Sequence, residues 1–462
     1  MSIREPMKMM RNAFGMALVW AVFCSIHNPP AITAQSRGDG SRYAIPDTDN
    51  GLPGKGPIRR YDWFKELWIK KRSAWAEEVG QDQGALVFLG DSITQGWGDS
   101  MGDKFAPAKV ANRGISGDTT RGVLIRMEED VLSLNPSGVV LLIGTNDLEE
   151  GAAPDVIAAN LALIIAKLKA HKASMPIVLC KVFPSADSKK RPSSLIKRIN
   201  ELYKKAVYGD PQVTILETWT LFANERGEAK ETEFPDLLHP NGLGYAKWAG
   251  ALRPVLETLH LVPSGSDDSF PLEQGYESLF NGVNLTGWES RPSSEGDIRT
   301  RNNWHKNSPE APPWPILKQG QRFDGLTETP DGRYRARNNR LVVAIPPEER
   351  KIQQLWTQED FDQDFVLVLE FRATPNADSG VFIRGRQLQC RDYLLAGPYK
   401  QLQRYKPLGW NELVVTVKGR TAQATCNGEI LEAAFEVPAS GPIGLEGDRG
   451  QIEYRRLRIK RL

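Results

Sequence analysis

The chain has 462 residues, of which 40% are hydrophobic and 25% are charged, and its formal net charge is +2 at pH 7. This composition is typical of globular proteins, and the length exceeds what one ordinary core accommodates, so we expect two domains. A net charge so close to zero argues against binding to nucleic acid or to an anionic membrane through bulk electrostatics.

The first 34 residues have the layout of an export signal. Basic residues precede an apolar run from Ala13 to Ile26, and a small residue, Ala34, stands at the expected cleavage position. The apolar run is short for a membrane anchor, which is the alternative interpretation. We therefore predict a signal peptide over residues 1–34 and an exported protein without stable membrane insertion after cleavage. Residues 35–58 are rich in Gly, Pro, Asp and Ser and are predicted to be a flexible lead-in.

A helix is predicted near the start of the first domain, within residues 59–78. Its large apolar residues recur at helical spacing, and they are Trp63, Phe64, Leu67, Trp68 and Trp75. Such a stripe is more often packed on a core than exposed to a ligand, so we expect these residues to be buried.

Residues 59–262 alternate apolar runs of strand length with amphipathic segments of helix length. The expected strands are 86–89, 109–111, 139–143, 177–183 and 213–216, and the later helices are 121–132, 155–171, 193–207 and 243–259. Apolar runs without period-two alternation, joined by helix-length connections, are typical of a parallel sheet covered on both faces. The sequence therefore predicts a doubly wound, flavodoxin-like α/β domain, with its site at the carboxyl ends of the strands.

Four polar motifs lie at the ends of predicted strands or in loops of this domain. They are Gly90-Asp91-Ser92-Ile93-Thr94, Asn112-Arg113-Gly114-Ile115-Ser116-Gly117-Asp118-Thr119-Thr120, Gly144-Thr145-Asn146-Asp147 and Asp236-Leu237-Leu238-His239-Pro240-Asn241. A serine hydroxyl attacks an ester only when a base removes its proton and donors hold the oxyanion that forms. An acid three residues before a histidine can orient the imidazole toward a serine. Each motif alone could be a turn or a helix cap, and their combination predicts a hydrolytic site.

In order and in rough separation, these motifs resemble those of the SGNH or GDSL hydrolase superfamily, in particular its branch of platelet-activating-factor acetylhydrolase catalytic subunits. The resemblance implies that Ser92 is the nucleophile, His239 the base and Asp236 the acid of a triad. It also implies an oxyanion hole formed by the backbone N–H of Ser92 together with Gly117 and Asn146. The activity implied is that of a serine esterase for short acyl groups, especially acetyl. No metal-ligand spacing is present, so we expect neither a metal nor another cofactor.

After residue 262 the helical periodicity ends. Residues 263–274 have the composition of a linker, and residues 275–462 contain short runs of alternating apolar and polar residues punctuated by Gly, Asn and Pro. This pattern predicts an all-β sandwich or jelly roll. Within it, residues 291–337 are polar and are expected to form a long decorated loop.

This half resembles the 3-keto-disaccharide hydrolase family, which implies a lectin-like jelly roll. The segments that carry the resemblance are 279–288, 369–372, 379–384, 409–412 and 441–445. Two positions depart from the family. The segment from Glu446 to Arg449 lacks a histidine, and Asp378 stands where asparagine is commoner, so no catalytic residue is carried over.

Together the two halves predict an exported serine esterase whose substrate is a small acylated molecule, with a carbohydrate ester as the expected class. The C-terminal half could hold or process the glycan. Alternatively, it could be the principal enzyme, a glycoside hydrolase for modified disaccharides, or a binding module without chemistry. Cys390 and Cys426 could form a disulfide, whereas Cys180 is expected to be a buried thiol. Trp97 could pack in the core or line the acyl or sugar site. The oligomeric state is left open.

Overall fold

The computed structural model describes residues 40–98, 100–265, 268–309, 313–345 and 353–462. The predicted signal peptide and the first residues of the predicted lead-in lie outside the described residues. Within the described part, no helix is long and apolar enough to cross a membrane. Later residues of the lead-in lie along the first domain, where Ile45 and Ile58 are buried and the Lys55 N–H donates to Asn160 Oδ1 (3.0 Å).

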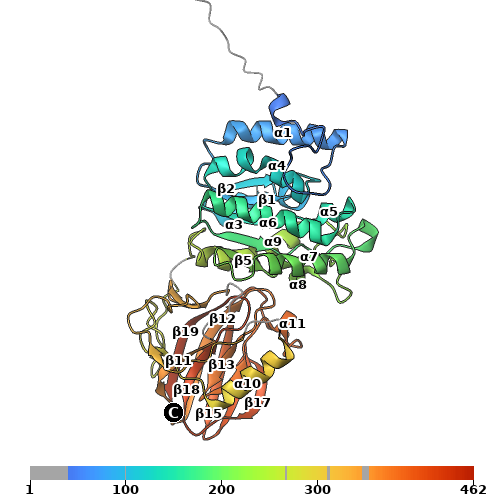
Figure 1. Ribbon diagram of the computed structural model, residues 1–462. Coiled ribbons are helices and arrows are strands. Elements are labelled where there is room, and N and C mark those ends of the chain that lie inside the picture. The colour runs from blue at the N-terminus through green and yellow to red at the C-terminus, as the bar shows by residue number, and fades with distance from the viewer. Residues whose placement is uncertain (1–39, 99, 266–267, 310–312, 346–352) are drawn as a thin grey trace, which may run out of the picture. The chain divides into compact units, whose positions relative to one another are not determined.

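The first domain is built on a five-stranded sheet in the order β2-β1-β3-β4-β5, and all of its strand pairs are parallel. The strands are β1 (Leu86–Gly90), β2 (Val110–Gly114), β3 (Gly138–Leu142), β4 (Ile177–Cys180) and β5 (Val213–Leu216). The helices are α1 (Asp62–Glu78), α2 (Ser92–Gln95), α3 (Ser100–Phe105), α4 (Thr120–Asp130), α5 (Thr145–Glu149), α6 (Pro154–His171), α7 (Ser193–Ala206), α8 (Thr218–Phe222) and α9 (Gly242–Thr258) (Figure 1). The predicted α/β class is confirmed.

Both faces of this sheet are covered by helices, which explains the uniformly apolar strands. β1 and β3 are buried along their whole length. Because successive side chains of a strand point to opposite faces, Phe88 packs with residues of α9 on one face and Leu89 with residues of α4, α6 and α7 on the other.

Two strands end more than one residue away from the prediction. β4 ends at Cys180 rather than at residue 183, because the backbone N–H and carbonyl of Val182 bond to the Asn200 side chain and not to a neighbouring strand. Its Oδ1 accepts from the Val182 N–H (2.7 Å) and its Nδ2 donates to the Val182 carbonyl (3.0 Å). β2 runs to Gly114, so the Asn112 motif begins inside the strand and not after it.

The aromatic residues of α1 divide between the core and the surface. Phe64, Trp68 and Trp75 are buried against Ile115, as the helical spacing predicts. Trp63 is 50% exposed, so the prediction that it is buried is wrong. The buried face of α1 runs from Phe64 to Trp75, and Trp63 lies beside this face. Trp97 is buried, with its ring centroid 4.6 Å from that of Trp248, which supports the core interpretation of that residue.

The C-terminal domain consists of two antiparallel sheets packed around one core. The larger sheet has the order β17-β16-β15-β12-β19-β10-β9, with β6 paired to β19, and the smaller has the order β14-β13-β18-β11-β7-β8. The strands are β6 (Glu277–Ser278), β7 (Trp288–Ser290), β8 (Gln321–Arg322), β9 (Tyr334–Arg337), β10 (Arg340–Val343), β11 (Gln354–Asp360), β12 (Phe365–Ala373), β13 (Gly380–Ile383), β14 (Arg386–Gln389), β15 (Asn411–Lys418), β16 (Thr421–Cys426), β17 (Glu429–Glu436), β18 (Pro442–Glu446) and β19 (Ile452–Arg461). The predicted β-sandwich is confirmed.

Two helices interrupt the C-terminal strands, α10 (Glu295–Asn307) and α11 (Tyr393–Ala396). The segment expected to be a loop therefore contains a helix of 13 residues. None of the α10 side chains is buried. The helix therefore needs no apolar stripe, and the sequence does not show one. Its remaining signal is a capping box, in which the Ser294 hydroxyl accepts from the Asp297 N–H and the Asp297 carboxylate accepts from the Ser294 N–H.

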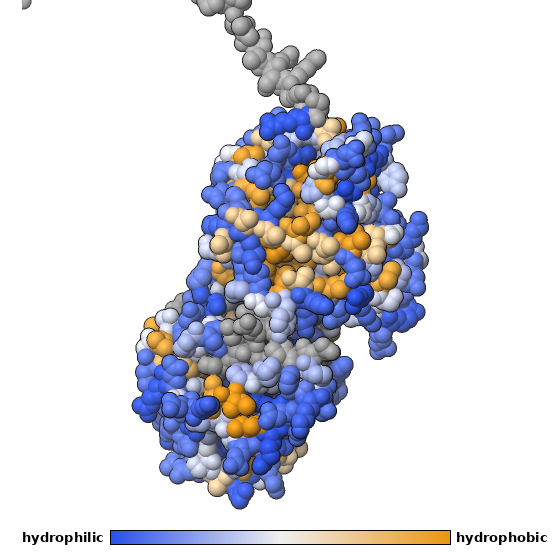
Figure 2. Space-filling model, in the orientation of Figure 1, coloured by the Kyte–Doolittle hydropathy of each residue, from blue (hydrophilic) through white to orange (hydrophobic). Residues whose placement is uncertain are grey.

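All three cysteines among the described residues are buried free thiols. The alternative of a disulfide between Cys390 and Cys426 is therefore wrong, and burial raises the pKa of the Cys180 and Cys426 thiols to about 12. On the face shown in Figure 2, polar residues predominate, and apolar residues gather mainly over the α/β domain. Leu163 of α6 and Leu195 of α7 are among its exposed large apolar residues.

Candidate active site

Ser92 is the first residue of α2 and follows β1 after a single residue. The turn is tight, since a Cβ added to Gly90 would overlap the Leu142 carbonyl oxygen of the neighbouring strand. The Asp91 carboxylate caps the helix by accepting a hydrogen bond from the Ile93 N–H (3.0 Å). Burial raises the pKa of Asp91 to about 7. The strand, the glycine and the cap together fix the backbone that carries Ser92.

His239 and Asp236 lie in a turn between β5 and α9 and complete a chain of hydrogen bonds with Ser92. His239 Nε2 lies 3.0 Å from Ser92 Oγ, and His239 Nδ1 lies 2.7 Å from Asp236 Oδ2. The other carboxylate oxygen, Asp236 Oδ1, accepts from the His239 N–H (2.7 Å) and the Leu238 N–H (3.0 Å). The structure thus brings all three predicted triad residues together.

The charge of the Asp236 carboxylate is stabilised within this turn. Partial burial opposes ionisation, but hydrogen bonds from the backbone and ring of His239, and from the Leu238 backbone, lower the pKa of Asp236 to about 2. A carboxylate that stays ionised can hold the imidazole in the tautomer with Nδ1 protonated, which leaves Nε2 free to accept a proton from Ser92.

A tyrosine joins α2, which begins at Ser92, to α9, which follows the turn of Asp236 and His239. The Tyr245 hydroxyl of α9 donates to the Ile93 carbonyl of α2 (2.8 Å). Asn241 caps the start of α9 by accepting from the Leu243 N–H (3.0 Å) and the Gly244 N–H (3.1 Å). These contacts hold the turn that bears His239 against the helix that bears Ser92. The sequence analysis missed Tyr245 because its partner lies 152 positions away.

The two other residues predicted for the oxyanion hole follow the strands on either side of β1. Gly90, Gly114 and Leu142 are register partners at the ends of β1, β2 and β3, so the three following loops lie at one edge of the sheet. Gly117 has a φ of +88°, and a Cβ at this position would come within 2.7 Å of the Trp63 ring and 2.9 Å of Arg59 Nη1. A residue with a side chain is therefore disfavoured at position 117.

Asn146 lies in the first turn of α5 and is 3% exposed. Its side-chain amide is held from two directions. Asn146 Nδ2 donates to the Asp118 carbonyl (2.9 Å), and Asn146 Oδ1 accepts from Arg191 Nη2 (2.9 Å). Because an amide nitrogen carries two hydrogens, one N–H of Asn146 remains to bind a substrate oxygen.

Buried carboxylates brace the loops behind the site. Asp118 accepts from Arg126 Nε (2.8 Å), and Asp147 accepts from the Thr120 hydroxyl (2.5 Å). Burial raises the pKa of both carboxyl groups to about 6 despite these partners. Asp118 thus holds a loop.

Comparisons with known families match both halves of the chain. The profile of the GDSL-like lipase/acylhydrolase family matches residues 88–247, and that of the 3-keto-alpha-glucoside-1,2-lyase-like domain matches residues 275–460. The chain joins a GDSL-like acylhydrolase domain to a 3-keto-disaccharide hydrolase-like domain. Both resemblances inferred from the sequence are confirmed, and the family of the first domain is one of ester hydrolases.

Individual relatives match the acylhydrolase domain. Human platelet-activating factor acetylhydrolase IB subunit alpha2 is 25% identical over 227 residues, which make up 48% of this chain and 94% of that protein. The alpha1 subunit from Pongo abelii is 26% identical over 208 residues, 44% of this chain and 88% of that protein. A solved GDSL-like lipase from Bacteroides thetaiotaomicron is 27% identical with a TM-score of 0.36, and the match covers 42% of this chain and 96% of that one.

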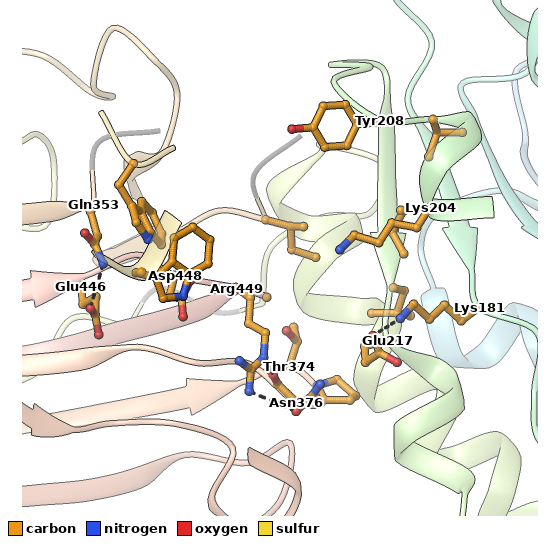
Figure 3. A pocket seen from close by; sticks show the side chains of 18 of the residues that line it. Lys181, Lys204, Tyr208, Glu217, Gln353, Thr374, Asn376, Glu446, Asp448 and Arg449 are labelled. Carbon is orange, nitrogen blue, oxygen red and sulfur yellow. Dashed lines mark hydrogen bonds and ion pairs between the residues drawn. The ribbon is translucent and has the colours of Figure 1, made fainter. Parts of the chain in front are cut away.

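The 3-keto-disaccharide hydrolase-like domain has a polar site of its own. Glu446, at the end of β18, is buried and accepts hydrogen bonds from Gln353 Nε2 (3.2 Å) and from the Gln387 side chain. Figure 3 marks the hydrogen bond from Gln353 to Glu446 with a dashed line. Burial, reinforced by neighbouring carboxylates, raises the pKa of Glu446 to about 8. The carboxyl group therefore tends to be protonated at neutral pH.

Asp378, which replaces the commoner asparagine, forms ion pairs in the same domain. Its carboxylate contacts Arg391 Nε, and its Oδ2 lies 2.9 Å from Arg449 Nη1. Despite these cations, burial raises the pKa of Asp378. Across the described part of the chain, no group of three or more His, Cys, Asp or Glu side chains is arranged to hold a metal ion.

Proposed function

We propose that the acylhydrolase domain is an exported serine esterase that removes short acyl groups, especially acetyl, from a carbohydrate ester. The observation that carries this proposal is the hydrogen-bonded chain from Ser92 Oγ through the His239 ring to the Asp236 carboxylate, at 3.0 and 2.7 Å. Three side chains from two separate parts of the sequence meet in the order that nucleophilic catalysis by a serine requires.

The proposed reaction starts when Ser92 Oγ attacks the ester carbonyl carbon and His239 Nε2 takes the hydroxyl proton. The negative charge on the carbonyl oxygen is held by the backbone N–H groups of Ser92 and Gly117 and by Asn146 Nδ2. Collapse of this intermediate breaks the ester bond, and the alcohol leaves with the proton from His239. Water then attacks the acyl-enzyme, again with His239 as base, and releases the acid and free Ser92.

Two findings support an acylated carbohydrate as the substrate. The curated relatives are named acetylhydrolases, and the second domain matches a family named for a glucoside. In addition, Tyr61 and Trp63 form a pair of half-exposed aromatic rings, with centroids 6.4 Å apart and ring planes 12° apart. Trp63 lies against Gly117, so this pair offers a flat surface for a sugar ring beside the proposed oxyanion hole.

For the C-terminal domain we propose glycan binding, and one observation favours the catalytic alternative. A carboxyl group with a pKa of about 8, such as Glu446, can donate a proton to a leaving oxygen at neutral pH. Cleavage of 3-keto-glycosides by the full chain, retained in Ser92→Ala and lost in Glu446→Gln, would establish this second activity. Binding of the glycan without cleavage would leave the domain as a binding module.

Export is proposed from the amino-terminal segment. Sequencing the N-terminus of protein recovered from the cell exterior or periplasm should give a chain that begins near Gln35. A full-length chain retained in the cytoplasm would contradict export without affecting the proposed chemistry.

The proposed chemistry is tested with the full chain and a panel of acetylated sugars, phospholipid esters and simple aryl esters. We expect Ser92→Ala to abolish hydrolysis of every ester that the wild type cleaves, while the circular dichroism spectrum stays unchanged. Full activity in this variant would end the proposal. A preference for phospholipid esters over acetylated sugars would leave the mechanism intact and overturn the substrate class.

A further inference from the structure

We propose that Arg191 is a positioning residue of the oxyanion hole, which fixes the orientation of the Asn146 amide and strengthens it as a donor. This inference rests on the proposed function, since Asn146 acts as a donor only if the domain is an esterase. Arg191 lies in the segment between β4 and α7 and is 3% exposed.

The Arg191 guanidinium contacts three oxygens of α5. Arg191 Nε donates to the Thr145 carbonyl (3.1 Å), and Nη2 donates to Asn146 Oδ1 (2.9 Å) and to Glu149 Oε2 (2.8 Å). Nη1 donates to the Lys189 carbonyl of its own loop (2.6 Å). The planar guanidinium therefore ties the loop after β4 to the helix that carries Asn146, which a lysine with one ammonium group cannot reproduce.

These contacts leave one favourable orientation for the Asn146 amide. In the observed orientation, Nδ2 faces the Asp118 carbonyl and Oδ1 faces Arg191. A flipped amide would place its NH₂ group against the guanidinium and its oxygen against the Asp118 carbonyl, so both contacts would become repulsive. The second N–H of Asn146 is thereby kept at the sheet edge where Ser92 lies.

The charge of Arg191 also strengthens the donor. An amide whose oxygen accepts from a cation is polarised, and its N–H groups become better donors to an anion. Arg191 is itself held by Glu149, which also contacts Arg59 Nη2, and Arg59 lies beside Gly117. Arg59 and Arg191, which share the Glu149 carboxylate, thus lie next to the two proposed donors outside α2. These donors are the Gly117 N–H and the Asn146 amide. Arg59 also pairs with Glu150 (2.7 Å), so carboxylates balance these charges, and the arginines contribute by fixing the two donors before the reaction.

The test compares Arg191→Met and Arg191→Lys with the wild type on an acetyl ester, with kcat and KM measured separately. We expect kcat to fall roughly 10- to 100-fold in Arg191→Met, less than the ~10²–10³ expected for losing a donor itself, while KM changes little. Arg191→Lys should recover part of the loss. Arg226→Met is the matched control, because that side chain is 79% exposed and should leave kcat unchanged.

A double-mutant cycle separates positioning of Asn146 from a general structural role. If Arg191 acts through Asn146, the Arg191→Met change should cost little further activity in an Asn146→Ala background. Losses that multiply in the double variant, or an unchanged kcat in Arg191→Met, would overturn the inference. If Arg191→Met does not fold, as judged by circular dichroism, the same cycle is run with Arg191→Lys. Activity that survives Ser92→Ala would instead reject the proposed function itself.

Discussion

The two domains each hold a carboxyl group at a candidate site, and the pKa values of the two groups are shifted in opposite directions. Asp236 is half exposed and receives N–H groups from one turn, and its pKa is lowered to about 2. Glu446 is buried and is contacted by two neutral amides, and its pKa is raised to about 8. The same chemical group is therefore an anion beside His239 and a neutral acid in the C-terminal domain.

This difference shows what each site is suited to do. An ionised carboxylate beside an imidazole stabilises the cation that forms when the ring takes a proton from serine. A neutral carboxyl group can donate a proton or a hydrogen bond to a ligand hydroxyl. Burial raises the pKa of both groups. For Asp236 the N–H groups of a turn outweigh burial, whereas for Glu446 burial dominates and nearby carboxylates raise the pKa further, against a hydrogen bond from Gln353 that lowers it.

The largest expected effect that separates the sites is that of Asp236→Asn. Asparagine keeps the shape but removes the charge and can hold the His239 ring in the wrong tautomer, so we expect kcat for an acetyl ester to fall by roughly 10³- to 10⁴-fold. Steady-state kinetics on the purified variant measure this fall. Glu446→Gln is the matched control, because it neutralises a carboxyl group of the other domain and should leave ester hydrolysis unchanged. Equal losses in both variants would contradict independent sites.

Removal of the Asn146 amide should have the next largest effect. Asn146→Ala deletes one of three proposed oxyanion donors, and we expect kcat to fall by about 10²–10³ with little change in KM, because the donor acts on charge that develops in the transition state. The same substitution should not alter glycan binding by the C-terminal domain. A rise in KM with kcat unchanged would show that Asn146 binds the substrate and does not stabilise the oxyanion.

The smallest expected effects are opposite pH dependences of stability. Asp236 has a lowered pKa, so its contribution is present above its ordinary pKa of about 4 and is lost as pH falls toward about 2. Glu446 has a raised pKa, so its contribution is present below its ordinary pKa of about 4.3 and is lost as pH rises toward about 8.

Thermal unfolding of the full chain between about pH 2 and about pH 8 measures both pH dependences of stability. We expect the unfolding transition that involves the C-terminal domain to move to lower temperature between about pH 5 and pH 8, and this shift to diminish in Glu446→Gln. An identical pH dependence in wild type and variant would show that Glu446 does not titrate between the folded and unfolded states as described.

Features that depend on local rules could be predicted from the sequence. The one-residue connection from β1 to α2 needs a glycine at the end of the strand, and Gly90 with the capping Asp91 encodes it. Fully buried parallel strands need continuous apolar runs, which the sequence displays. The turn from Asp236 to His239 is equally local, because its carboxylate accepts from the residue three positions later.

Features that depend on distant partners could not be predicted. Arg191 follows two lysines and looks like part of a solvated basic run, yet its partner Asn146 lies 45 positions earlier. Helical spacing predicts burial for Trp63, but this residue lies beside the buried face of α1, which runs from Phe64 to Trp75. α10 is a surface helix with no buried side chain, so it needs no apolar stripe, and its sequence carries no periodic signal that predicts a helix.

The central claim, that His239 activates Ser92 for attack, is tested most directly by labelling with a fluorophosphonate and locating the adduct by peptide mass spectrometry. We predict a single adduct on Ser92 in the wild type and a labelling rate that falls by orders of magnitude in His239→Ala. An adduct on another residue, or equally fast labelling of Ser92 without His239, would contradict the account.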